Sequence, residues 1–322
     1  MSWGCASSYR GRAEGAAVQE TQYRNYADIL AACRKLGKVR IAVAAAHDQD
    51  ILSAVRAARD EGIAEAVLVG DRPRIEVLAK KTGLEFLEIV HEPDEAGAAA
   101  VAAALVREGR ADALMKGLVN TSDFLRAVLE PESGLRGGSL LSHLAAFEIP
   151  GRDRLEFHTD GGINIAPDLV EKKTILLNAL GALVRVGVRA PKVAILSANE
   201  QVNPRMPSTM DARALVEMWD RGLIPAGILE GPVALDVAVS RRAAEHKGIR
   251  SRISGEVDLF LMPNIEAGNI LGKALVYYAK AKMAGLVLGA ACPIVLTSRS
   301  ETAEGKLHSI ALASLVALSP AL

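Results

Sequence analysis

The chain has 322 residues, of which half are hydrophobic and only 4% are aromatic. Lysines and arginines together number 38, as do aspartates and glutamates, so the formal net charge is zero. The apolar content excludes a disordered chain, and the composition excludes a collagen-like or disulfide-rich one. A dedicated nucleic-acid binder needs a basic face, so no nucleic-acid partner is expected.

The cysteines and the N-terminus indicate where the protein works. Cys5, Cys33 and Cys292 are widely spaced and form no CxxC pair, which favours a reducing, cytoplasmic setting. Residues 1–20 are small and polar without the apolar core of a signal peptide, so we expect a flexible N-terminal extension. No apolar stretch of about 20 residues is free of charge, so no membrane span is expected.

Short apolar runs alternate with longer helical patterns along the chain. The expected strands are residues 39–46, 64–70, 84–90, 111–115, 154–158, 192–196, 257–262 and 293–297. The expected helices between and after them are residues 50–60, 72–81, 95–108, 123–130, 167–186, 208–221, 265–284 and 303–317. This alternation predicts an α/β fold with a parallel-rich sheet that helices cover on both faces.

Eight strand–helix pairs would also fit a closed barrel by number. Residues 131–153 argue against a barrel, because they contain four glycines and two prolines and show no clean period. We interpret this stretch as a junction between two domains.

Five expected strands are followed by small, amide, hydroxyl or basic residues. In open α/β sheets, ligands bind beyond the carboxyl ends of strands. The residues concerned are Lys116 with Gly117, residues 159–162, residues 197–200, residues 263–269, and Ser298 with Arg299. Caps and turns are the alternative for each, since most of these residue types favour such positions. Lys116 and Arg299 are poor cap residues, however, and free glycine N–H groups attract anions, so a phosphate-bearing substrate is expected.

Several common motifs are absent from the sequence. No GxGxxG follows a strand, and neither a GxSxG elbow nor an HExxH motif occurs. The six histidines are scattered and no tight DxD cluster exists, so no bound metal is expected.

Five segments resemble the phosphate acetyl/butyryltransferase family. They are LMKGLVNTSDFLRAVL (114–129), SANEQVNPRMPSTMDA (197–212), GPVALDVAVS (231–240), GEVDLFLMPNIEAGNILGKAL (255–275) and AGLVLGAACPIVLTSRSE (284–301). The combination of PNIEAGN with a downstream TSR is the most specific part. The likeness covers about residues 25–320 and is closest to the butyryltransferase branch.

The resemblance implies a fold and an activity. The fold would be a two-domain α/β fold of the isocitrate/isopropylmalate dehydrogenase type, with the active site in the interdomain cleft. Domain I would comprise residues 21–148 and 295–322, and domain II residues 149–294. The activity would be reversible transfer of a short acyl group, butyryl or similar, between CoA and phosphate through a ternary complex. Family members are typically homodimers, and no bound cofactor is implied beyond CoA or acyl-CoA as substrate.

The resemblance also assigns catalytic residues. Ser298 and Arg299 match the family's catalytic pair, in which the arginine would stabilise the oxyanion or hold phosphate and the serine would position the thiol or carbonyl. Arg126 corresponds to a family arginine near the phosphate. The acetyl branch has an aspartate base where Gly305 stands here, so Glu301 or Glu304 could substitute. A helix-start charge favoured by the helix dipole is the alternative for both glutamates.

Further candidates for substrate binding carry an open alternative. They are Lys116, Thr159, Gly161, Asn199, Asn264, Glu266 and Asn269. Structural hydrogen bonding, or simple solvation for Lys116, would explain each equally well.

Two other functions remain possible. A non-catalytic acyl-CoA-binding homologue is suggested by the missing aspartate. A decarboxylating dehydrogenase of the same fold would need a nicotinamide cofactor and a metal held by aspartates, and the absence of an aspartate cluster argues against it.

Overall fold

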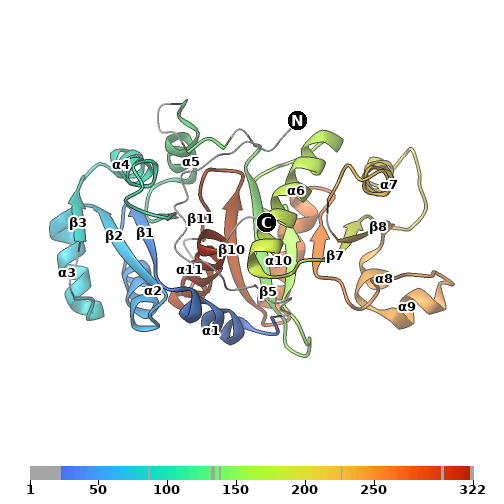
Figure 1. Cartoon of the computed structure of the whole chain (residues 1–322), viewed down its shortest axis with the longest axis horizontal. Helices are drawn as coiled ribbons and strands as arrows, with labels where there is room; N and C mark the ends of the chain where they lie inside the picture. Colours follow the sequence, from blue (N-terminus) through green and yellow to red (C-terminus); the bar gives the residue numbers. More distant parts are fainter. Residues whose placement is uncertain are drawn as a thin grey trace.

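The protein is an α/β structure with helices on both faces of a large sheet (Figure 1). The computed structural model describes residues 23–85, 88–131, 135–137, 139–225, 227–298 and 301–319. The predicted extension at residues 1–20 lies outside these residues. Within them, no helix has both the length and the apolar character needed to cross a membrane.

In the described part of the chain the strands form one sheet of 11, in the order β3-β2-β1-β4-β11-β10-β5-β6-β9-β7-β8. The strands are β1 (Val39–Ala44), β2 (Ala64–Gly70), β3 (Glu88–His91), β4 (Ala113–Lys116), β5 (Ser142–Glu148), β6 (Glu156–Thr159), β7 (Lys192–Leu196), β8 (Ile228–Val233), β9 (Leu259–Leu261), β10 (Lys282–Leu288) and β11 (Ile294–Val295).

The side chains of each strand point alternately to the two faces of the sheet, where they pack into hydrophobic cores. One face carries a continuous core under α1 (Tyr26–Leu36), α2 (Gln49–Asp60), α3 (Arg72–Thr82), α6 (Leu169–Val186), α7 (Pro207–Asp220) and α11 (Ala303–Leu318). The other face carries three separate clusters under α4 (Glu95–Arg107) and α5 (Thr121–Leu129), under α8 (Leu235–Val239) and α9 (Arg241–His246), and under α10 (Ile265–Tyr277). The sheet is therefore buried on both sides, as its apolar strands require.

The two parallel halves of the sheet run in opposite directions. Strands β1, β2, β3, β4 and β11 are parallel to one another, and so are β6, β7, β8 and β9. Between them β10 and β5 pair antiparallel with each other, β10 with β11, and β5 with β6. The carboxyl ends of the two halves consequently lie at opposite edges of the sheet, which the sequence did not reveal.

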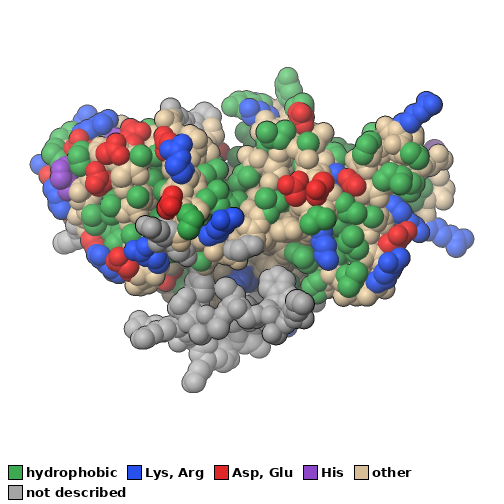
Figure 2. Space-filling model, turned by 90° about the horizontal axis from the view of Figure 1, so that it is seen from above, with side chains coloured by type: hydrophobic (Ala, Val, Ile, Leu, Met, Phe, Trp, Pro, Cys, Tyr) green, Lys and Arg blue, Asp and Glu red, His purple; other side chains and the backbone are tan. Residues whose placement is uncertain are grey.

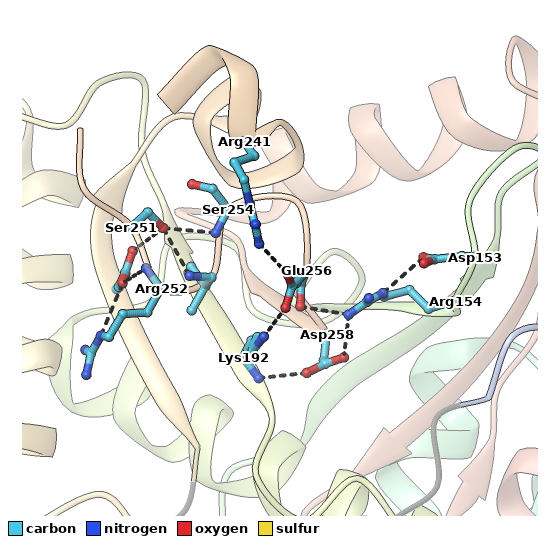
Figure 3. A network of polar contacts seen from close by, with 11 residues as sticks. Asp153, Arg154, Lys192, Arg241, Ser251, Arg252, Ser254, Glu256 and Asp258 are labelled. Atoms are coloured by element: carbon cyan, nitrogen blue, oxygen red, sulfur yellow. Dashed lines mark hydrogen bonds and ion pairs between the residues drawn. The ribbon is translucent and has the colours of Figure 1, made fainter. Parts of the chain in front are cut away.

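A network of charged groups holds the amino ends of β6, β9 and β7 together (Figure 3). Glu256, just before β9, accepts hydrogen bonds from Lys192 and Arg241. The Lys192 N–H donates to Asp258 over 2.8 Å. Arg154 donates to the Glu256 carbonyl over 3.0 Å and lies 3.7 Å from Asp258. These charges neutralise one another, so we assign this network to alignment of the strands.

The predicted alternation is confirmed for most elements, with three corrections. Residues 142–148 form β5 inside the stretch predicted as an irregular junction. The helix predicted over residues 265–284 ends at Tyr277, and residues 282–288 form β10. Strand β8 and helices α1, α8 and α9 were not predicted.

The predicted domain boundaries fall within the continuous sheet. Strand β5 ends at Glu148, where domain I was expected to end, and it pairs with β6 and β10 of the expected domain II. Because the sheet continues across the expected boundary, it does not mark two domains, and the division into two domains remains a prediction. In the view from above, acidic and basic side chains are interspersed over both halves (Figure 2), in line with the zero net charge.

Candidate functional site

A pocket lies at the carboxyl ends of β1, β4 and β11. It is a small, open pocket with a cavity volume of about 20 Å³. Its lining consists of Asp48, Ile51, Lys116, Gly117, Leu118, Thr297, Ser298 and Lys306. The pocket therefore brings together the KG and TSR motifs, although about 180 residues separate them in sequence.

Lys116 enters this pocket from the last position of β4 and is only 5% exposed. Its ammonium group donates to the Gly117 carbonyl over 3.1 Å. Gly117 is required here because a Cβ would lie 2.2 Å from the Ala44 carbonyl oxygen at the end of β1. Without a side chain at Gly117, the chain stays close to β1 at the point where Lys116 lines the pocket. Because Lys116 is almost fully buried, it is not the solvated surface lysine that was considered as an alternative.

The sequence analysis missed Lys306, a second buried lysine in this pocket. Lys306 lies in the first turn of α11, is 4% exposed, and donates to the carbonyl oxygen of Glu301. Asp48 was also missed; it caps α2 by accepting the Ile51 N–H over 2.9 Å. The sequence did contain a signal for Lys306. It is a lysine shortly after the TSR motif, in a helix that is otherwise largely apolar and therefore expected to be buried.

Ser298 lines the pocket, and its catalytic role remains a prediction. Its carbonyl oxygen accepts the Glu301 N–H over 3.1 Å, and Thr302 then caps α11 through Gly305. These bonds tie Ser298 to the start of α11. Arg299 lies outside the described residues, so its predicted role remains a prediction.

The two candidate bases, Glu301 and Glu304, lie in different surroundings. The Glu301 carboxylate folds back onto α11, such that a Cβ at Gly305 would lie 2.2 Å from its Oε1. The Glu301 carboxylate therefore occupies the space that an aspartate at position 305 would fill. Burial raises the pKa of Glu301. Glu304 is instead exposed and pairs with Lys282 at 2.7 Å, and this hydrogen bond lowers its pKa.

Arg126 lies on α5, beyond the pocket segment at Lys116 and Gly117. Its side chain is 72% exposed and forms an ion pair with Asp123 at 2.9 Å. Arg126 does not line the pocket, and its phosphate-binding role remains a prediction.

The loop after β6 is organised by Asp160. The Asp160 carboxylate accepts backbone N–H groups of His143, Gly162, Ile163 and Asn164 at 2.8 to 3.3 Å, and the Asn164 side-chain amide at 2.6 Å. The Gly162 N–H is therefore already engaged. Phosphate binding by residues 159–162 remains a prediction, without a contribution from this N–H group.

The remaining predicted residues belong to this second edge of the sheet and make local bonds. Thr159 donates to the His143 carbonyl over 2.8 Å, and Asn269 donates to the Gly161 carbonyl over 3.2 Å. Asn264 caps α10, and Asn199 accepts the N–H of Gln201. Glu266 is exposed in the first turn of α10. None of them lines the Lys116 pocket, and their substrate-binding roles remain predictions.

The register aligns the ends of β6 and β11 in one row, with β5 and β10 between them. Thr159, Leu144, Leu286 and Val295 form one row across the sheet, from the end of β6 to the end of β11. Beyond Thr159 the chain turns back over β5. Gly162 lies against His143, where a Cβ would be 3.0 Å from the ring, and Ile163 packs against the core under α4 and α5.

The sequence matches the family described as phosphate acetyl/butaryl transferase over residues 78–314. The chain belongs to this family. A phosphate butyryltransferase of Clostridium acetobutylicum is 46% identical over 296 residues, covering 91% of this chain and 98% of that protein. A phosphate acetyltransferase of Rhizobium meliloti is 41% identical over 298 residues, covering 92% and 94%.

Comparison with a solved structure shows that the fold is shared. A branched-chain phosphotransacylase from Enterococcus faecalis superposes with a TM-score of 0.76 and 32% identity, covering 86% of this chain and 99% of that chain. The predicted family, the α/β fold class and the acyltransferase class of the enzyme are therefore confirmed. Among the described residues no group of three or more metal-ligating side chains occurs.

Proposed function

We propose that this protein transfers a butyryl or similarly short acyl group reversibly between CoA and inorganic phosphate, through a ternary complex. The observation that carries the proposal is the pocket in which Lys116 and Lys306 meet Ser298, in a chain of the phosphate acetyl/butyryltransferase family. The substrates are acyl-CoA, phosphate, acyl phosphate and CoA. The 46% identity to a butyryltransferase supports the butyryl preference.

The reaction exchanges two nucleophiles at one carbonyl carbon. A phosphate oxygen attacks the thioester carbon, a C–O bond forms, the C–S bond breaks, and the sulfur leaves as CoA thiolate. Holding both partners in one site supplies much of the acceleration. The Arg299 guanidinium stabilises the negative carbonyl oxygen of the tetrahedral state, a contribution of about 3 kcal/mol for such a donor. The Ser298 hydroxyl orients the carbonyl or the sulfur.

In the reverse direction the thiol of CoA loses its proton to a base. We assign this role to Glu301, because its carboxylate takes the place of the aspartate of the acetyl branch and its pKa is raised by burial. A raised pKa improves a carboxylate as a general base near neutral pH. This placement removes the reason for a non-catalytic homologue, which was the missing aspartate.

We further propose a cytoplasmic homodimer. Cys33 and Cys292 are free thiols, as expected for a reducing compartment. Helix α10 exposes Ile270, Tyr277 and the adjoining Tyr278, and exposed apolar groups on one element are typical of an interface. Sedimentation velocity tests the dimer, and a monomer at micromolar concentration would contradict it.

The test of the activity is a panel of acetyl-, propionyl-, butyryl- and branched acyl-CoA with phosphate, in which free thiol is measured. We expect thiol release with butyryl-CoA at least as fast as with acetyl-CoA. Arg299→Gln is expected to reduce turnover by orders of magnitude and to leave thermal unfolding unchanged. No thiol release with any of these substrates would disprove the proposal, and CoA binding without turnover would indicate the non-catalytic homologue.

A further inference from the structure

Two of the buried lysines differ in what neutralises them. Lys172 on α6 pairs with the Asp211 carboxylate at 2.6 Å. Lys306 is as deeply buried, yet its hydrogen bond goes to the neutral carbonyl of Glu301. Among the described residues no carboxylate oxygen lies within 4.0 Å of the Lys306 ammonium. The Glu301 carboxylate lies near enough for the Lys306 charge to oppose the rise of its pKa on burial, but it makes no direct ion pair with the ammonium. An anionic ligand would supply the hydrogen-bonded counter-charge that such a buried cation favours.

Lys116 adds a second buried ammonium to the same pocket. The lining contains one carboxylate, that of Asp48, whose Oδ1 is already engaged by the Ile51 N–H at the start of α2. Helix α11 also begins beside the pocket, and the positive end of its dipole adds to the attraction for an anion. The pocket therefore combines the positive charges of Lys116 and Lys306 and a helix start with the single negative charge of Asp48.

We propose that Lys306, together with Lys116, forms the subsite for the phosphate group that accepts or donates the acyl group. This inference rests on the proposed function, because it assigns one substrate to one part of that site. Ser298 on the same wall places the anion next to the acyl-transfer position, and Glu301, whose carbonyl fixes Lys306, carries the base.

The test compares Lys306→Gln and Lys306→Arg with wild type in the butyryl-CoA assay. We expect Lys306→Gln to raise the KM for phosphate about 10- to 100-fold, as for a lost charge-assisted hydrogen bond. The KM for butyryl-CoA should change less than about threefold, and Lys306→Arg should recover part of the phosphate affinity. The matched control is Lys80→Gln on the exposed face of α3, which should behave as wild type.

Thermal unfolding with inorganic phosphate gives a readout that does not depend on turnover. Phosphate should raise the melting temperature of wild type and Lys80→Gln, and should not raise that of Lys306→Gln. An active wild type with an unchanged phosphate KM and an undiminished phosphate shift in Lys306→Gln would overturn the subsite. A raised KM for butyryl-CoA alone would also overturn it, because it would assign the lysine to a phosphate of CoA. An inactive wild type that still shows the lysine-dependent shift would refute only the proposed function.

Discussion

The contact between Gly161 and Gly268 joins the PNIEAGN helix to the loop after β6. A Cβ at Gly268 would lie 2.7 Å from the Gly161 Cα and 3.0 Å from the Asp160 carbonyl oxygen. Both are backbone atoms, so they cannot move aside as a flexible side chain could. We expect Gly268→Ala to force α10 away from the loop, with an overpacking cost of about 1–3 kcal/mol.

Gly181 provides a matched control, because it also lies inside a helix and a Cβ there meets nothing within 4 Å. Gly181→Ala should stabilise the protein by about 0.4–1 kcal/mol through the unfolded state alone. Since both variants share this gain, the difference between them isolates the contact. At about 2–4 °C per kcal/mol, Gly268→Ala should melt roughly 2–12 °C below Gly181→Ala in calorimetry. Equal melting temperatures would show that the two backbones do not touch, and the reasoning would fail.

Two further predictions concern titratable groups. Glu301→Gln should slow formation of acyl-CoA from acyl phosphate about 10²- to 10⁴-fold, and Glu304→Gln far less; similar losses in stopped-flow assays of the two would contradict the assignment of the base. His308 stacks on Tyr26, with the ring centres 3.9 Å apart, and burial lowers its pKa to about 4. Because the unfolded chain takes up this proton near pH 6.5, stability should be lost as the pH falls from 6.5 towards 4, by about 3 kcal/mol at most. His308→Phe should flatten that slope in urea unfolding measured at several pH values, and an unchanged slope would exclude His308 as its cause.

The sequence determined much of the fold because apolar runs and helix caps act locally. Strand 192–196 and the start of α11 at Ala303 were predicted at the residues where they occur. Strands β5 and β10 were missed because they were assigned to a junction and to the end of a helix, and the pairing of β5 with β10 joins segments that are distant in sequence. Local periodicity carries no information about such pairing.

The candidate site, like the fold, was predictable from the sequence only in part. Motifs alone identified Lys116, Ser298 and Glu301, since each lies next to a strand end or a family segment. Only the tertiary structure showed that the two halves of the sheet point in opposite directions, which separates Lys116 from the Asp160 loop. It also brought Lys306 into the pocket and placed Glu301 over Gly305. The direction of a strand and the burial of a charge depend on what packs alongside, which no single segment of sequence contains.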